Sequence, residues 1–90
     1  MDAKNSNNEL IYLLERELKK LKIVFDKVKF LDKDLEKFVK SYWEDCKYFY
    51  EKRDNIKAFE LINYIWGILD CMANKNLLEI PEDIRKWFKV

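Results

Sequence analysis

The amino-acid sequence predicts an all-α protein, an antiparallel three-helix bundle with a short C-terminal fourth helix, in a single domain over residues 1–90. The composition is 49% hydrophobic and 39% charged with a single glycine and a single proline, which suits helices and leaves little material for hairpin turns. Apolar residues also recur at helical spacing in three successive stretches. The last stretch, residues 54–74, is apolar over an arc of roughly 240°, whereas a surface helix needs little more than about 100°. We therefore expect this helix to be central and to contact at least two partners.

The first helix is expected over residues 8–29, where leucine, valine and phenylalanine side chains share one face. Residues 1–7 are polar and lack this periodicity, which predicts a disordered tail. The outer face of the helix has a local excess of positive charge, and a phosphate-contacting basic face would use Arg16, Lys19, Lys20 and Lys27. We favour a solvated helix surface, because no glycine-rich loop or base-stacking aromatic platform accompanies these residues.

The second and third helices are expected over residues 33–52 and 54–74. Asp32 and Asp54 stand where N-caps are required, because their carboxylates can accept from the free N–H groups of a first turn. Between the helices, Arg53 must occupy the position after the helix end where glycine or asparagine is usual. So short a connection predicts an antiparallel hairpin.

A narrow polar arc on the central helix is a candidate groove. Its four residues are spaced by four, three and four positions: Asn63, Gly67, Asp70 and Asn74. Glycine inside a helix costs about 1 kcal/mol relative to alanine, which suggests close backbone access for a ligand. The favoured alternative is a salt-bridged surface, in which Asp70 pairs with Lys27, Lys29 or Lys37. In the second helix, Tyr48 points away from the apolar stripe and is a candidate contact residue.

Beyond the central helix we expect a loop over residues 75–80 and a short helix over residues 81–88 that begins at Pro81. Cys46 and Cys71 lie on successive antiparallel helices with an offset too large for a disulfide. We interpret both as small buried hydrophobic residues of a protein in a reducing cytoplasm.

The sequence contains no histidine, no threonine and no glycine-rich loop. These absences exclude Ser-His and Cys-His nucleophile systems, histidine-ligated zinc and the usual phosphate loops. We predict no catalytic residue, no metal site and no cofactor. The net charge of +1 provides no field that would attract nucleic acid to the whole molecule. The longest apolar run, residues 61–73, is too short for a bilayer, and the polar N-terminus does not predict a signal peptide, so we expect a cytoplasmic protein without a membrane partner.

Part of the sequence resembles the uncharacterised archaeal family DUF357. The residues that carry the resemblance are Tyr42, Asp45, Tyr48, Phe49, Asp54, Ala58, Phe59, Ile62, Tyr64, Gly67 and Asp70. The chain departs from the family at Arg53, where the family turn has glycine, and at Ile65, where alanine is common. The resemblance implies a compact helical bundle of archaeal, cytoplasmic type and implies no activity. The hairpin is also similar to those of tetratricopeptide repeats and small HEPN domains, whose ribonuclease members need an Arg-x4-6-His motif that is absent here.

These observations predict a non-enzymatic protein–protein interaction module. A protein partner or a second copy in a homodimer would cover part of residues 54–74. The alternative is an RNA-associated module, or a partner of a nucleotidyltransferase, that uses the basic face of residues 8–29.

Overall fold

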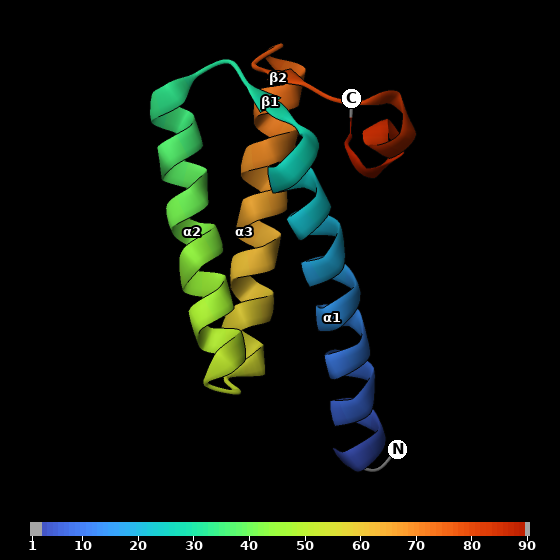
Figure 1. The fold of residues 1–90 in the computed structure, drawn as a ribbon. Helices are drawn as coiled ribbons and strands as arrows, with labels where there is room; N and C mark the ends of the chain where they lie inside the picture. The colour runs from blue at the N-terminus through green and yellow to red at the C-terminus, as the bar shows by residue number, and fades with distance from the viewer. Residues whose placement is uncertain (1–2, 90) are drawn as a thin grey trace.

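The structure is a computed structural model that describes residues 3–89 (Figure 1). Its elements in chain order are α1 (Ala3–Lys27), β1 (Lys29–Phe30), α2 (Lys33–Glu51), α3 (Asn55–Asn74), β2 (Leu78–Glu79) and the 3-10 helix η1 (Glu82–Trp87). The predicted all-α class is confirmed, because the sheet in the described part of the chain consists of only two strands of two residues each.

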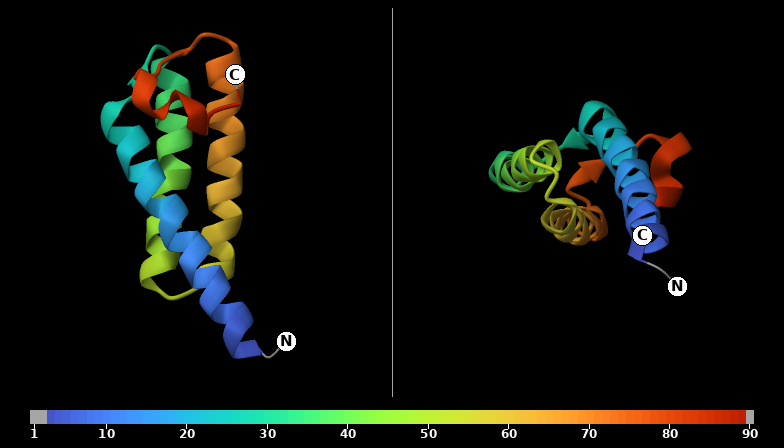
Figure 2. Two further views of the ribbon diagram at one scale, coloured as in Figure 1. Left: turned by 90° about the vertical axis from the view of Figure 1, so that its right-hand side faces the viewer. Right: turned by 90° about the horizontal axis from the view of Figure 1, so that it is seen from below.

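The helices α2 and α3 form an antiparallel hairpin, and the most extensive contact between elements is the one between them. The helix α1 packs against α3 and runs in the same direction as α3, and its N-terminal turns extend past the turn that joins α2 to α3 (Figure 2). Side chains also tie α1 to α2, because the ring of Phe25 stacks on Trp43 with the centroids 5.3 Å apart. The result is an elongated molecule of 44 × 24 × 18 Å.

The start of the first helix requires a correction. The helix α1 begins at Ala3, so residues 3–7 are helical rather than part of the expected tail, while residues 1 and 2 lie outside the described range. Neither proline nor glycine stands near this end, so the helix can continue without a break in its hydrogen bonds. At the other end α1 stops at Lys27, two residues early, because the chain then enters β1.

The turn between α2 and α3 has the predicted local geometry. Arg53 has a φ of 63°, and its N–H donates to the carbonyl of Tyr50 at 3.0 Å. The next N–H, that of Asp54, donates to the carbonyl of Phe49 at 2.9 Å, which completes a Schellman motif. The Asp54 carboxylate accepts from the N–H of Lys57 at 3.2 Å and so caps α3. At the start of α2, Asp32 caps the helix in the same way, through the N–H of Leu35 at 3.0 Å.

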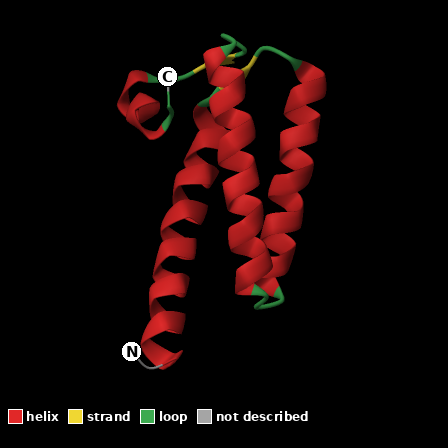
Figure 3. Ribbon diagram, turned by 180° about the vertical axis from the view of Figure 1, so that it is seen from behind, coloured by secondary structure: helices red, strands yellow, loops and turns green. Residues whose placement is uncertain are grey.

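The segment over residues 75–80, expected to be a loop, contains β2. Asn76 ends α3 with a φ of 59°, a conformation that asparagine tolerates better than most residues. The chain then pairs antiparallel with β1, with Phe30 opposite Leu78 (Figure 3). A further bond, from the N–H of Leu31 to the carbonyl of Leu77 at 2.9 Å, extends this tie. The strand pair therefore fixes the C-terminal ends of α1 and α3 to each other.

The fourth helix is a 3-10 helix over Glu82–Trp87, not the expected helix over residues 81–88. Six residues are too few for a stable α-helix, and tighter 3-10 turns are common in such short pieces. Ile84 and Phe88 are buried, and the ring of Phe88 meets Trp66 of α3 edge to face at 5.7 Å. This contact docks the C-terminal segment onto α3, and on α1 the ammonium of Lys20 lies 5.6 Å from the ring centroid of Trp87.

The core draws on every element that the structure describes. Its fully buried side chains include Leu14, Leu21, Val24, Val39, Cys46, Ile62, Ile65 and Leu69. The Cys46 thiol donates to the carbonyl of Ala58 at 3.4 Å, where the small alanine lets α2 and α3 approach each other. None of the helices over residues 3–89 combines the length and the hydropathy that a bilayer crossing demands.

Candidate functional site

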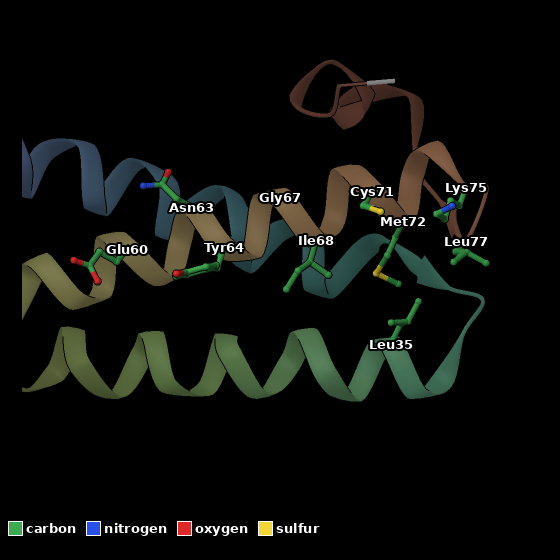
Figure 4. A pocket seen from close by; sticks show the side chains of 10 residues that line it. All are labelled: Leu35, Glu60, Asn63, Tyr64, Gly67, Ile68, Cys71, Met72, Lys75 and Leu77. Atoms are coloured by element: carbon green, nitrogen blue, oxygen red, sulfur yellow. The ribbon is translucent and has the colours of Figure 1, made fainter.

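An open groove of about 790 Å³ runs along the solvent-facing side of α3 and reaches the beginning of α2 (Figure 4). Its lining residues are Leu35, Glu60, Asn63, Tyr64, Gly67, Ile68, Cys71, Met72, Lys75 and Leu77. Figure 4 shows Tyr64 and Ile68 pointing from α3 toward α2, while Leu35 points from α2 toward Met72. Most of the lining is therefore apolar, and the two charged residues, Glu60 and Lys75, lie at its two ends.

Much of the groove lining comes from residues of α3 that share one face of the helix. Glu60, Tyr64, Gly67, Cys71 and Lys75 follow one another at intervals of three or four residues and so share one face. Gly67 lies at the middle of this face. A Cβ atom added to it would have no atom within 4 Å among those that the structure describes, so the surface above Gly67 is open. The glycine leaves the backbone of α3 accessible to another molecule.

An aromatic strip adjoins the groove and continues it across α2. Tyr64 is 63% exposed, and its ring stacks on Tyr42 with the centroids 6.2 Å apart. Tyr42 in turn meets Phe38 edge to face at 5.2 Å, and Phe38 is 50% exposed. Rings at these separations support one another in a fixed arrangement. The strip Phe38–Tyr42–Tyr64 is thus an ordered apolar surface in contact with water.

The four residues of the predicted polar arc do not form a single site. Asn63 and Gly67 line the groove, whereas Asp70 and Asn74 bind the C-terminal backbone of the same chain. The N–H of Lys89 donates to Oδ1 of Asp70 at 3.1 Å, and the Asn74 amide donates to the carbonyl of Lys89 at 2.9 Å. Asn63, Gly67 and Asp70 also border a smaller hollow of about 340 Å³ beside Trp87. Gly67 therefore has the open groove on one side and, on the other side, the part of α3 that the C-terminal segment of the chain covers.

The prediction that Asp70 forms a salt bridge with a lysine is wrong. Within the described side chains, Asp70 forms no ion pair with Lys27, Lys29 or Lys37, and Lys27 lies 3.9 Å from the carboxylate of Asp83 instead. The reason is the position of η1, which brings Asp83 to α1, and the chain that follows η1 brings Lys89 to α3.

The basic face of α1 is partly neutralised. Arg16 lies 3.0 Å and Lys20 3.5 Å from the carboxylate of Glu17. The ammonium of Lys20 also lies 5.6 Å from the ring centroid of Trp87. With Lys27 beside Asp83, only Lys19 of the four predicted residues is exposed without such a partner in the described part of the chain. The arrangement gives little support to a cluster of phosphate contacts.

Tyr48 and Cys71 lie on different surfaces. Tyr48 is 54% exposed and faces away from the groove, with the ammonium of Lys52 5.6 Å from its ring centroid. Both cysteines are free, as predicted. Cys46 is buried as expected, but Cys71 is exposed and lines the groove, so the prediction of a buried residue is wrong there.

The sequence analysis did not single out Tyr64 and Cys71 as site residues, although both line the groove beside Gly67. Tyr64 and Cys71 lie three and four residues from Gly67, which is a signal that the sequence contains. Their role was hidden because apolar residues on a wide arc are assigned to the core.

Side chains with a shifted pKa, where the structure describes them, lie outside the groove. Burial raises the pKa of the Cys46 thiol to about 11. A hydrogen bond to the Glu15 carboxylate at 2.7 Å raises the pKa of Tyr50, and a hydrogen bond from Lys40 at 2.6 Å lowers the pKa of Glu36. No three cysteine, aspartate or glutamate side chains within the described residues come close enough together to hold a metal ion. The groove itself combines an apolar centre with one charged residue at each end.

The fold and the groove together define a small all-α domain built on an antiparallel helical hairpin that exposes an apolar surface along its second helix. A family model described as "Protein of unknown function (DUF357)" matches residues 10–78, and the chain belongs to this family. The match runs from α1 to β2 and includes every residue that lines the groove. No curated protein and no solved structure matches the chain.

Proposed function

We propose that this member of the DUF357 family is a non-enzymatic protein–protein interaction module. Its scaffold is an antiparallel three-helix bundle, and its partner binds in the groove along α3. The observation that carries the proposal is the continuous exposed apolar surface formed by the groove and by the strip of Phe38, Tyr42 and Tyr64.

The composition of this surface resembles that of known interfaces. Protein interfaces have an apolar, aromatic-rich centre and a polar rim, and tyrosine is among the residues that contribute most to binding. Here Tyr64, Ile68 and Cys71 lie toward the centre, and Glu60 and Lys75 lie at the ends. Burial of one large apolar side chain contributes roughly 1.5–3 kcal/mol, so a partner that covers this face gains substantial binding free energy.

The RNA-associated alternative has less support from the described side chains. Glu17 and Asp83 lie beside three of the four predicted basic residues, and these ion pairs reduce the charge available to phosphates. The pull-down described next discriminates between a protein-binding and an RNA-binding function.

The test compares three tagged proteins in a pull-down from native lysate with and without nuclease: the wild type, Tyr64→Glu and Tyr12→Glu. Tyr64 is 63% exposed in the groove, and Tyr12 is 65% exposed on α1, so the two substitutions are matched in chemistry and exposure and differ in place. Circular dichroism of each variant checks that the helices are retained.

We expect the wild type and Tyr12→Glu to retain a stoichiometric protein partner, which can be a different protein or an untagged copy of this chain, with and without nuclease. Tyr64→Glu should lose it. Recovery that disappears with nuclease would support the RNA-associated module instead. The absence of any protein partner, or equal recovery by Tyr64→Glu, would contradict the proposed function.

A further inference from the structure

The two charged residues of the groove have opposite signs and lie at its opposite ends along α3 (Figure 4). Glu60 and Lys75 are fifteen residues apart, which is about 22 Å along a helix. Both are exposed, and neither forms a salt bridge with any side chain in the described part of the chain. The groove thus has an acidic end and a basic end that the fold leaves unpaired.

The midpoint between these two residues falls between Gly67 and Ile68. If a second α3 lay antiparallel across the first, with a two-fold axis through this midpoint, each residue would face the one equally far beyond the midpoint. Glu60 would then face Lys75 of the second copy, and Lys75 would face Glu60 of that copy. In the same register Tyr64 would face Cys71 of the second copy.

We propose that the partner in the groove is a second copy of this chain, and that two α3 helices pair antiparallel about Gly67 in a two-fold symmetric dimer. This inference rests on the proposed function, because it names the partner of the same groove. The surface is self-complementary in charge, which a two-fold interface requires, since the same patch must meet itself. Two ion pairs form in each dimer and fix the register.

The open surface at Gly67 suits a helix crossing at that point. Helices pack with their axes about 8–10 Å apart, and the distance depends on the side chains at the contact. In this register Gly67 faces Ile68 of the second copy, and because nothing in the described structure fills the space above the glycine, that space can receive the isoleucine side chain. A shallow crossing of about 20° keeps the helix ends near each other, which the long side chains of Glu60 and Lys75 need in order to meet.

The area of a stable interface indicates that α2 takes part as well. A specific interface buries about 800 Å² on each partner, which is close to an eighth of the 6380 Å² exposed by this chain. One face of α3 is narrow, and the strip of Phe38 and Tyr42 on α2 lies directly beside it. We therefore infer that the aromatic strip forms one edge of the dimer interface.

The test is a charge exchange followed by sedimentation equilibrium. The wild type should behave as a dimer, with twice the mass of the 11.1 kDa chain. Glu60→Lys and Lys75→Glu should each raise the dissociation constant of the dimer by at least about tenfold, because each places like charges opposite one another. The double variant Glu60→Lys/Lys75→Glu should return to within about threefold of the wild type, because it restores both pairs with reversed signs.

The controls are Glu9→Lys and Lys22→Glu, which change the net charge equally at exposed positions of α1 outside the groove. Both should leave the dissociation constant unchanged. A monomeric wild type, or a double variant no tighter than the single variants, would overturn the inference. If the wild type is a monomer that binds a different protein, and Tyr64→Glu abolishes that binding, only the dimer is contradicted. If the wild type is a monomer without any protein partner, the proposed function is contradicted too.

Discussion

The backbone N–H of Lys89 donates a hydrogen bond of 3.1 Å to the carboxylate of Asp70, which joins the C-terminal end of the described chain to the last turns of α3. Asn74, one turn further along α3, reinforces this tie through the carbonyl of Lys89. The polar arc of α3 therefore serves on one side to hold the chain's own C-terminal segment. The groove on its other side remains open to a partner.

The substitution Asp70→Ala should release this segment. Loss of the hydrogen bond should lower the free energy of unfolding by about 0.5–1.5 kcal/mol, and the amide of Lys89 should exchange its hydrogen faster. Urea denaturation and hydrogen exchange followed by mass spectrometry measure the two effects. Asp83→Ala is the control, because its ion pair at 3.9 Å is exposed and should contribute little. Equal effects of the two substitutions would contradict the assigned role of Asp70.

The turn at Arg53 offers a stabilising substitution. Arg53 has a φ of 63°, which is unfavourable for a residue with a Cβ atom and free of strain for glycine. Arg53→Gly should raise the free energy of unfolding by about 0.5–1 kcal/mol, since relief of this strain exceeds the loss of chain entropy. The neighbouring Lys52 has a φ of −79°, so Lys52→Gly should not stabilise the protein. A gain at Lys52 similar to that at Arg53 would show that the positive φ is not the cause.

Gly67→Ala should stabilise α3 and thereby separate folding from association. Alanine favours a helix interior over glycine by about 1 kcal/mol, and the added Cβ meets no atom within 4 Å. We expect a gain of about 0.5–1 kcal/mol in urea denaturation, measured in the Glu60→Lys background so that dimer formation does not contribute. A loss of stability would mean that Gly67 packs against something within the chain and that the surface above it is not open.

The two cysteines should differ in reactivity. The thiolate is the reactive form, and burial raises the pKa of the Cys46 thiol to about 11, while Cys71 is exposed. A thiol reagent at mildly alkaline pH should therefore modify one cysteine in the native Glu60→Lys variant, in which the proposed dimer is weakened and Cys71 is accessible, and two in the denatured protein, as counted by mass spectrometry. Modification of Cys46 at the same rate as Cys71 would contradict its burial.

The raised pKa of Cys46 also predicts a pH dependence of stability. A thiol whose pKa is higher in the folded state binds its proton more tightly there, so its contribution to stability is complete below about pH 9 and is lost as the pH rises toward 11. Because lysine and tyrosine titrate in the same range, the measurement is the difference in unfolding free energy between the wild type and Cys46→Ala across this window. A constant difference would contradict the shift.

The proposed register predicts a specific disulfide. Tyr64 faces Cys71 of the second copy, so Tyr64→Cys should form intermolecular disulfides with the native thiol under mild oxidation. Within one chain the two positions lie seven residues apart, about 10 Å along α3, which is too far for a disulfide. Tyr64→Cys/Cys71→Ser is the control and should remain uncrosslinked, as should the wild type. In this register position 64 of one copy lies about 10 Å along the helix axis from position 64 of the other, and the same holds for position 71. Equal crosslinking of the control would exclude this register.

The elements decided by neighbouring residues could be read from the sequence. The caps at Asp32 and Asp54 and the Schellman turn at Arg53 each involve residues at most five positions apart, so the sequence alone predicts them. Helical spacing of apolar residues likewise predicts the three helices and the central position of α3, because the period of side chains depends on the backbone alone. Membership of the DUF357 family also follows from the pattern of residues along the chain.

The tertiary structure decided everything that depends on how these helices meet. The bonds of Asp70 and Asn74 to Lys89 span at least fifteen residues, and the pairing of Phe30 with Leu78 spans forty-eight, so no local pattern indicates them. The wide apolar arc of α3 predicts at least two partners, but only the packing shows that α1 and α2 leave Tyr64, Gly67 and Cys71 uncovered. The spacing of hydrophobic residues indicates which helix faces are apolar. It does not indicate whether the same chain or another molecule covers them, because removal of apolar surface from water is favourable in either case.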